Sequence, residues 1–368
     1  MKLNHIAFSS GKSLFPIGEG GGETIAHDLL SGLFQHHIAC DAFGVIQLSQ
    51  SEILNRSLIE VETDLSISYD QVAMSTFTSQ TVTFPSHVVY HYNIPYSTSL
   101  TTDDHFLRHL DRAIRSNSYD CMLFQAEKSP AIFRTAARAG LFPVFYLQNG
   151  LELRLFEDPS ALPLILTNST FYHDKILREH GLRSEVLYPA VHLNRYRVKE
   201  NSHEFITMIN PVLVKGIVPF LQMAIATPER KFLIVEGWGT SAEILDMIRK
   251  IPNVTYMPKQ IDMRTVYDKT HILVVPSQWE EAFGRVITEA QVNGIPVLAS
   301  AVGGIPEAVG DGGLLVEEIQ DPEAWRQGLD RVEARYEELS ALATAHAERF
   351  SVENAVQRFR EIVESIAV

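Results

Sequence analysis

The chain has 368 residues, of which 45% are hydrophobic and 21% charged, and its formal net charge at pH 7 is −14. This length is typical of two domains, because a single hydrophobic core rarely grows so large. The acidic charge argues against nucleic acid as a partner and against electrostatic attachment to anionic membranes.

The sequence predicts neither a membrane-spanning segment nor a secretory signal. It has no run of 18 apolar residues, and its first residues lack a basic segment followed by an apolar one. The two cysteines, Cys40 and Cys121, lie in apolar surroundings and lack the spacing of a metal site. These features predict a cytoplasmic protein with reduced thiols and no integral membrane association.

A glycine-rich loop connects the first predicted strand to the first predicted helix. His5 to Ser9 is a short apolar run, and apolar residues from Ile25 to Leu33 recur at helical spacing. Glycines just before a helix allow the backbone to approach a ligand, so Gly21 and Gly22 are candidate ligand contacts. The alternative is a flexible surface loop without a binding role.

The next stretch, from Phe43 to about Thr102, is polar and rich in serine and threonine. Thr81 to Phe84 and Val88 to Tyr90 are its clearest strand candidates. Asp103-Asp104 resembles half of a metal-binding acid pair. A helix is expected to begin near Phe106, and favourable acidic charge at its start explains the aspartates better than a metal does.

Two buried strands, Tyr119 to Gln125 and Val144 to Gln148, flank a helix expected between Pro130 and Gly140. This alternation continues a parallel strand, helix, strand pattern. Polar residues follow both strands, among them Gln125 and Asn149, and we expect them at the carboxyl edge of the sheet.

The C-terminal half begins with the strand Phe205 to Ile209, followed by Asn210 and Lys215. A lysine beside a helix start can neutralise diphosphate oxygens, although a solvated lysine is the alternative. Phe232 to Val235 and Val254 to Met257 are further strands, and Glu236-Gly237 and Pro258 follow them directly.

Two glutamates stand eight positions apart between the strands Ile272 to Val275 and Ile295 to Ala299. Glu281 falls in the loop after the first strand, and Glu289 falls about one turn inside the helix that opens at Gly284. Backbone N–H groups at the start of a helix can bind an anion, above all a phosphate. The expected anion-binding residues are Phe283, Gly284 and Arg285.

The two carboxylates can bind hydroxyl groups, and the backbone N–H groups between them can bind a phosphate. Together they predict a pocket for a nucleotide sugar. The alternative is that Arg285 and Glu289, four positions apart, form an ordinary surface pair. Under that alternative Glu281 is a solvated loop residue.

The stretch around these glutamates resembles the E-x7-E signature of the retaining glycosyltransferases of family 4. The matching residues are Pro276-Ser277, Glu281, Phe283-Gly284, Glu289-Ala290, Gly294, Pro296-Val297, Gly303-Gly304 and Glu307. The resemblance implies a GT-B fold, an α/β architecture of two Rossmann-like α/β/α domains facing across a cleft. It places the N-terminal domain at residues 1–190, completed by a C-terminal helix at about 354–368, and the nucleotide-sugar-binding domain at residues 191–353.

The resemblance also implies roles for individual residues. Glu289 would hold the ribose hydroxyls and Glu281 the sugar hydroxyls, while Lys215 and the loop amides would hold the diphosphate. Further donor contacts are implied for Gly21, Gly22, Asn210, Glu236, Gly237, Met257, Pro258, Ala282, Phe283, Gly284 and Arg285.

Two positions depart from the family pattern. Asn149 stands where the family usually has a histidine that contacts the transferring sugar, and Asn210 stands where it usually has an arginine. Asparagine can donate and accept hydrogen bonds but cannot titrate. We expect Asn149 to serve in catalysis in place of the histidine, and Arg285 to replace the charge missing at Asn210.

The resemblance predicts transfer of a sugar from a nucleoside-diphosphate sugar to a hydroxyl acceptor with retention at the anomeric carbon. The acceptor is expected to be a small molecule or a soluble saccharide, and neither a metal nor a cofactor is expected. Two alternatives are a nucleotide-sugar epimerase of the same fold and a non-catalytic protein that binds a nucleotide sugar.

Overall fold

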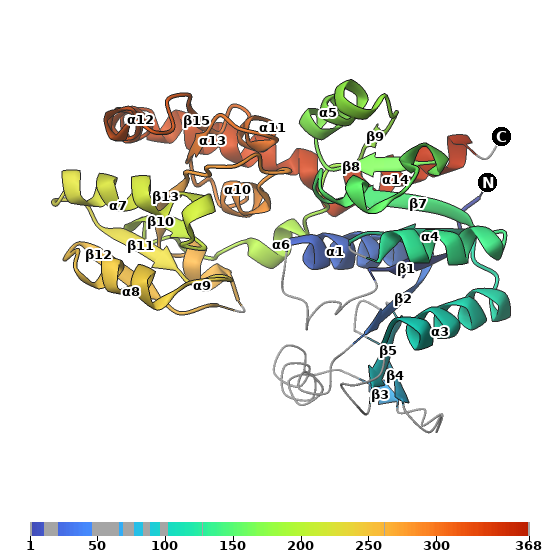
Figure 1. The fold of residues 1–368 in the computed structure, drawn as a ribbon. Coiled ribbons are helices and arrows are strands. Elements are labelled where there is room, and N and C mark those ends of the chain that lie inside the picture. The colour runs from blue at the N-terminus through green and yellow to red at the C-terminus, as the bar shows by residue number, and fades with distance from the viewer. Residues whose placement is uncertain are drawn as a thin grey trace. The chain divides into compact units, whose positions relative to one another are not determined.

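The computed structural model of the chain describes residues 2–10, 21–45, 66–68, 77–83, 89–95, 102–126, 128–260 and 262–366 (Figure 1). These residues form two compact units. Unit 1 comprises Met1–Asn168, Tyr172–Ala190 and Val352–Val368, and unit 2 comprises Ser169–Phe171 and Val191–Ser351. Each unit has its own sheet and its own hydrophobic core.

Unit 1 contains a nine-stranded sheet in the order β3-β4-β5-β2-β1-β6-β7-β8-β9. Only β4 runs antiparallel to its neighbours, and the remaining pairs are parallel. The strands are β1 (His5–Ser9), β2 (Ala39–Val45), β3 (Ser66–Ser68), β4 (Phe77–Thr83), β5 (Val89–Pro95), β6 (Cys121–Phe124), β7 (Phe142–Leu147), β8 (Ile165–Thr167) and β9 (Glu185–Val186).

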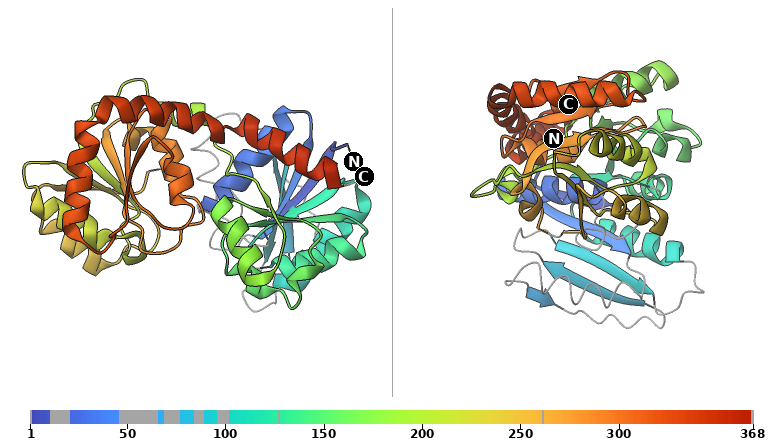
Figure 2. Two further views of the ribbon diagram at one scale, coloured as in Figure 1. Left: turned by 90° about the horizontal axis from the view of Figure 1, so that it is seen from above. Right: turned by 90° about the vertical axis from the view of Figure 1, so that its left-hand side faces the viewer.

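The helices of unit 1 include two that lie side by side although they come from opposite ends of the chain (Figure 2). A Cβ atom at Gly32 of α1 would lie 2.5 Å from Cγ2 of Val352 in α14, so glycine permits this close packing. The elements are α1 (Gly21–Gln35), α3 (Thr102–Ser116), α4 (Ser129–Arg138), α5 (Thr170–His180), α14 (Val352–Ile366), and the 3₁₀ turns η1 (Glu152–Leu155) and η2 (Pro159–Ala161).

Unit 2 contains a six-stranded, fully parallel sheet in the order β12-β11-β10-β13-β14-β15. The chain enters at the centre, builds outward to one edge and then returns to build toward the other. The strand order therefore reverses between β10 and β13, which is where ligands bind in open α/β sheets. The strands are β10 (Phe205–Ile209), β11 (Phe232–Val235), β12 (Val254–Met257), β13 (Thr270–Val275), β14 (Val297–Ser300) and β15 (Gly313–Val316).

Helices of unit 2 bury their apolar stripes against this sheet. Trp325 of α12 is fully buried, and its indole N–H donates to the carbonyl oxygen of Ile319 at 2.9 Å. The elements are α6 (Leu193–Tyr196), η3 (Leu213–Lys215), α7 (Ile217–Ala226), α8 (Ala242–Arg249), α9 (Arg264–Tyr267), α10 (Arg285–Gln291), α11 (Ile305–Val309), α12 (Pro322–Ala334), α13 (Tyr336–Ala347) and η4 (Glu348–Phe350).

The structure confirms most predicted elements and corrects two. The family resemblance also implies a strand from Val186 to Val191, but β9 ends at Val186, and Pro189 beyond it has no N–H to donate to a neighbouring strand. Helix α3 begins at Thr102, so Asp103 and Asp104 stand in its first turn and not in a preceding loop. Within the described residues, no helix is both long enough and apolar enough to cross a bilayer.

Candidate functional site

The predicted donor-binding residues of unit 2 follow the carboxyl ends of four neighbouring strands. Because these strands are parallel, their carboxyl ends share one edge of the sheet (Figure 1). The loop after β10 carries Asn210 and Lys215, and the loop after β13 carries Glu281. Glu236-Gly237 follows β11, and Pro258 follows β12.

Lys215 and Glu281 meet across the point where the strand order reverses. The Lys215 ammonium forms an ion pair with Oε1 of Glu281 and lies 5.5 Å from the centre of the Trp279 ring. Ser277 Oγ and Trp279 Nε1 donate to the same oxygen at 2.8 and 3.0 Å. The side chains of Lys215 and Glu281 are 23% and 11% exposed, so part of this pair remains accessible to a ligand.

Glycines let the loops that carry this pair pack on one another. Gly216 has φ +86°, and a Cβ there would lie 1.8 Å from the carbonyl oxygen of Pro276. Gly303 has φ +60°, and a Cβ there would lie 2.3 Å from the carbonyl oxygen of Glu281. Any larger residue would displace these backbones, so glycine at these two positions permits the loops of Lys215 and Glu281 to pack as observed.

Arg285 and Glu289 form a second ion pair inside unit 2. Arg285 Nε donates to Glu289 Oε1 at 2.8 Å, and the guanidinium also donates to the Tyr196 hydroxyl at 2.9 Å. Tyr267 donates its hydroxyl to Glu289 Oε2 at 2.8 Å, and burial together with the Glu289 carboxylate raises the pKa of Tyr267 well above its usual value. The pair exists at the predicted spacing, but its side chains are only 7% and 8% exposed, so it is not a surface pair.

This geometry bears on the expected replacement of a missing arginine at position 210. The Arg285 side chain is directed at Glu289 and Tyr196, and its charge is balanced by the Glu289 carboxylate. Glu289 in turn receives one hydrogen bond on each oxygen, and a carboxylate has room for about four. Glu289 can therefore still accept hydrogen bonds from ribose hydroxyls. Its role in binding the ribose stays a prediction.

Asn210, which stands where the family usually has an arginine, forms hydrogen bonds with the exposed Trp238. Its backbone has φ +67°, a conformation that asparagine adopts more readily than most residues. In the amide orientation that satisfies both atoms, Asn210 donates to the Trp238 carbonyl and accepts from Trp238 Nε1, each at 2.8 Å. A Cβ at Gly237 would lie 2.6 Å from the Asn210 side chain, so glycine makes room for this contact.

Residues at the ends of β11 and β12 are joined by hydrogen bonds. The Glu236 N–H donates to the Met257 carbonyl at 2.9 Å, and Glu236 Oε2 accepts from the Lys259 N–H at 3.2 Å. Pro258 between them is exposed. These residues form one side of the strand edge, where the sequence predicts contacts to the nucleotide.

The loop from Ala282 to Arg285 leads from Glu281 into α10. Gly284 precedes the helix with φ +96°, and Phe283 is 2% exposed. The Phe283 ring packs edge-on against Phe350, with ring centres 4.9 Å apart. Phe283 therefore anchors this loop in the core, and its predicted contribution to a ligand is limited to its backbone.

The polar residues that the sequence singled out in unit 1 are held by hydrogen bonds within that unit. Gln125 donates to the Gly22 carbonyl, and Gln148 donates to Gln125, each at 3.0 Å. Asn149 accepts from the Leu151 N–H at 3.0 Å and donates to Glu152 at 3.2 Å. Asn149 is thus fastened to the turn that follows it.

The predicted roles of three residues in unit 1 remain untested by this geometry. Gly21 and Gly22 lie in the first turn of α1, whereas the sequence predicted them in the loop just before the helix. Gly11-Lys12-Ser13 and the glycines before Gly21 lie outside the described residues. The donor or acceptor contacts of Gly21 and Gly22, and the catalytic role of Asn149, stay predictions.

Sequence reasoning missed several residues that hold the predicted ones in place. Trp279, Tyr196 and Tyr267 donate or accept hydrogen bonds at the two ion pairs, and Glu152 holds Asn149. Tyr196 and Tyr267 are far from their partners in sequence and gave no signal. Trp279 stands two positions before Glu281, and an aromatic residue so close to a predicted carboxylate was the available clue in the sequence.

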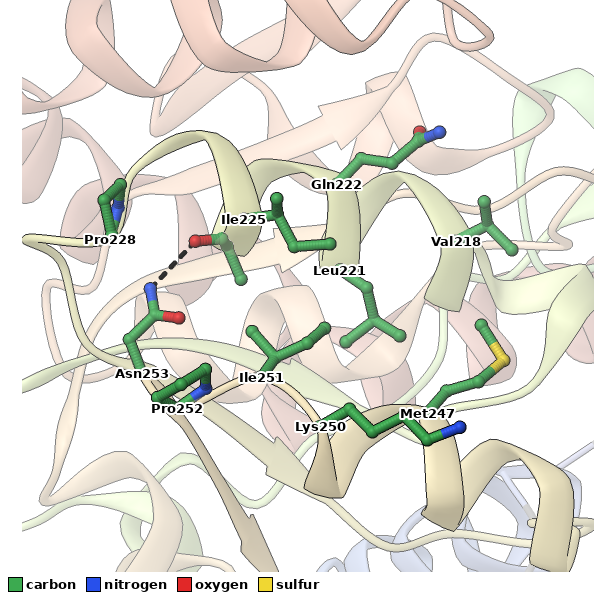
Figure 3. Close-up of a pocket in the computed structure, with 11 residues that line it drawn as sticks. Val218, Leu221, Gln222, Ile225, Pro228, Met247, Lys250, Ile251, Pro252 and Asn253 are labelled. Atoms are coloured by element: carbon green, nitrogen blue, oxygen red, sulfur yellow. Dashed lines mark hydrogen bonds between the residues drawn. The ribbon is translucent and has the colours of Figure 1, made fainter.

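A groove of about 560 Å³ lies elsewhere in unit 2, between α7 and α8 (Figure 3). It is predominantly apolar and contains none of the predicted site residues. Its residues are Val218, Leu221, Gln222, Ala224, Ile225, Pro228, Met247, Lys250, Ile251, Pro252 and Asn253. Within the described parts of the chain, no group of three or more His, Cys, Asp or Glu residues is arranged to hold a metal ion.

Part of unit 2 matches a known protein family. Residues 205–334 match the family described as glycosyl transferases group 1. The chain is 30% identical over 233 residues to D-inositol 3-phosphate glycosyltransferase of Rhodococcus opacus, covering 54% of this chain and 52% of that one. Over 224 residues it is 29% identical to the enzyme of the same name from Mycobacterium bovis, covering 52% of this chain and 46% of that one. The chain thus spans about half the length of these curated relatives.

Solved structures resemble the chain over nearly its whole length. Anabaena HepE in complex with UDP and glucose has a TM-score of 0.72 at 18% identity, covering 98% of this chain and 99% of that one. A glycosyltransferase from Rickettsia africae has a TM-score of 0.71 at 13% identity, covering 100% and 99%. Sucrose-phosphate synthase from Thermosynechococcus elongatus has a TM-score of 0.70 at 18% identity, covering 99% of each chain. These likenesses confirm the predicted two-domain α/β fold of the GT-B class.

Proposed function

We propose that the chain transfers a sugar from a nucleoside-diphosphate sugar to a hydroxyl acceptor, because residues 205–334 match the family described as glycosyl transferases group 1. The observation that carries this proposal is the meeting of Lys215 and Glu281 where the strand order of unit 2 reverses. That point is where parallel α/β sheets bind their ligands. At that point Lys215 can bind a phosphate group, and Glu281 beside it can bind sugar hydroxyls.

In the proposed complex, the diphosphate lies beside Lys215 and the sugar lies beside Glu281. The Lys215 ammonium neutralises charge on the diphosphate, and it is exposed enough to turn toward a ligand. Glu281 accepts hydrogen bonds from sugar hydroxyls. Glu289 accepts hydrogen bonds from the ribose hydroxyls, and its own hydrogen bonds with Arg285 and Tyr267 hold it in position.

Catalysis in this proposal is electrostatic and positional. As the bond between the sugar and the diphosphate breaks, negative charge grows on the leaving oxygen, and Lys215 stabilises it in a partly desolvated site. Glu281 holds the sugar in a fixed orientation toward the acceptor. We propose that transfer proceeds with retention and that lysine and backbone N–H groups supply the charge stabilisation without a metal.

We propose a small hydroxyl compound as the acceptor. Support comes from the names of the relatives, which include an inositol 3-phosphate glycosyltransferase and a sucrose-phosphate synthase. The HepE structure with UDP and glucose supports a uridine nucleotide as the first donor to test.

The first test is thermal stabilisation of the full chain by UDP, GDP, ADP, CMP and TDP. A ligand that binds only the folded state at about 100 times its dissociation constant stabilises it by roughly 2.7 kcal/mol. We expect a clear response to one nucleoside diphosphate, followed by slow hydrolysis of the matching nucleotide sugar in the absence of acceptor. The configuration of the released sugar, measured by NMR before it equilibrates, then tests retention.

Three other outcomes would contradict the proposal. Interconversion of the sugar would indicate an epimerase. Nucleotide binding without hydrolysis or transfer, over a panel of hydroxyl acceptors, would indicate a non-catalytic binding protein. No response to any nucleotide would remove the basis for the donor site.

A further inference from the structure

Three hydrogen-bond donors converge on one oxygen of Glu281. The Lys215 ammonium, the Ser277 hydroxyl and the Trp279 indole N–H all contact Oε1. These donors come from two loops, since Lys215 follows β10 and the other two follow β13. A carboxylate held by three donors on one oxygen has little freedom to rotate about its last bond.

The second oxygen of Glu281 takes no part in these hydrogen bonds. Across the parts of the chain that the structure describes, every hydrogen bond to this carboxylate falls on Oε1 and none on Oε2. The Glu281 side chain keeps 11% of its surface exposed. The arrangement therefore separates the carboxylate into one oxygen for the protein and one for a ligand.

We propose that Trp279 is a positioning residue that holds Glu281 so that Oε2 is presented to the donor sugar. This inference rests on the proposed function, because it assigns Trp279 a part in the same site. Lys215 cannot serve as the permanent anchor, since a diphosphate competes for its ammonium. Ser277 and Trp279 remain on Oε1 when Lys215 turns to the ligand.

Trp279 is better suited to this task than the other two donors. Its indole N–H can only donate, so it cannot reverse its hydrogen bond as a hydroxyl can. The Ser277 hydroxyl also lies 3.4 Å from the carbonyl oxygen of Val214, a second acceptor for its single proton. The Trp279 ring also faces the Lys215 ammonium at 5.5 Å, an attractive cation–π geometry that keeps the lysine beside Glu281.

The experiment compares two substitutions of Trp279 that separate the effect of the aromatic ring from the effect of the N–H donor. Trp279→Phe keeps an aromatic ring and removes the N–H, whereas Trp279→His places a ring N–H at the corresponding position of its five-membered ring. We expect Trp279→Phe to lower kcat for sugar transfer about tenfold, the loss typical of one hydrogen bond to a charged group. We expect Trp279→His to recover most of that loss, and both variants to bind the nucleoside diphosphate within about twofold of the wild type.

A double-mutant cycle tests whether Trp279 acts through Glu281. In a Glu281→Gln background, adding Trp279→Phe should change the remaining kcat by less than about twofold, because the oriented carboxylate is already lost. A further tenfold loss in that background would show that Trp279 acts independently and would overturn the inference. Unchanged kcat in Trp279→Phe alone would also overturn it.

Folding and function are checked separately in the same experiment. The melting temperature of Trp279→Phe should match that of the wild type, since 43% of Trp279 is exposed. If Trp279→Phe unfolds, the test becomes the kcat of Trp279→His compared with that of the wild type. A tenfold lower kcat in a normally folded Trp279→His variant would contradict the inference. If wild-type protein neither transfers nor hydrolyses any nucleotide sugar, the proposed function fails and this inference fails with it. Failure in the variants alone leaves the proposed function standing.

Discussion

The two ion pairs of unit 2 join the same kinds of group but differ in origin and exposure. Lys215 and Glu281 are 66 positions apart, come from loops after different strands, and are 23% and 11% exposed. Arg285 and Glu289 are four positions apart in one helix and are 7% and 8% exposed. Glu281 is bonded on one oxygen, whereas Glu289 is bonded on both.

Because of this difference, the Lys215–Glu281 pair can exchange partners with a ligand, whereas the buried Arg285–Glu289 pair cannot. A ligand can draw the Lys215 ammonium away from Glu281, because the lysine remains partly solvated and the carboxylate keeps two other donors. Removing either partner of the buried pair leaves an uncompensated charge in the interior. We therefore expect substitutions at the first pair to affect turnover and those at the second to affect stability.

The largest expected effect is the loss of stability on breaking the buried pair. Arg285→Met should lower the free energy of unfolding by about 3 to 5 kcal/mol, because Glu289 is left buried without its cation. Urea denaturation of the full chain measures this change. The double variant Arg285→Met with Glu289→Leu is the matched control, and it should be more stable than the single variant. Equal stability of Arg285→Met and the wild type would contradict the contrast between the pairs.

The next largest effect is expected on turnover at the accessible pair. Glu281→Gln should lower kcat about a hundredfold, an amount typical of removing one preorganised charged group from a catalytic site. Nucleoside-diphosphate affinity, measured by calorimetry, should stay within about threefold of the wild type, because the proposed contact is to the sugar. If nucleotide affinity falls as steeply as kcat, Glu281 does not have the role proposed here.

Lys215→Met should produce a smaller change that appears in both measurements. Loss of its charge-assisted hydrogen bond to phosphate should weaken nucleoside-diphosphate binding about tenfold and lower kcat/KM by at least that factor. The melting temperature should fall less than in Arg285→Met, since this pair is partly solvated. Nucleotide affinity equal to that of the wild type would show that Lys215 does not contact the diphosphate.

The smallest effect concerns alkaline pH and the buried pair. Burial beside Glu289 raises the pKa of Tyr267 above the usual 10.0, so the folded protein retains a proton that the unfolded chain releases. Stability from this group is present below pH 10 and is lost as the pH rises above that value. Tyr267→Phe should therefore make the free energy of unfolding fall less steeply between pH 9 and 11. An unchanged slope would mean that the Tyr267 hydroxyl ionises equally in both states.

Local sequence patterns determined much of the fold of this chain. Apolar runs of four or five residues marked β1, β10 and β11 with the observed bounds, because buried parallel strands leave little room for polar residues. The bounds of β12 were also predicted, although none of its residues is fully buried. The spacing of Glu281 and Glu289 around Gly284 located the loop and helix correctly. The pairing of Arg285 with Glu289 was considered from their spacing only as the alternative to ligand binding, since residues four apart share a helix face.

Tertiary structure alone decided which side chains those residues meet. Burial of the Arg285–Glu289 pair depends on Tyr196 and Tyr267, which come from other elements. The contact of Lys215 with Glu281 depends on strand order, because β10 and β13 are neighbours in the sheet although β11 and β12 separate them in the chain. Sequence periodicity reports which face of an element is apolar, but contacts between distant loops arise only when the whole sheet has formed.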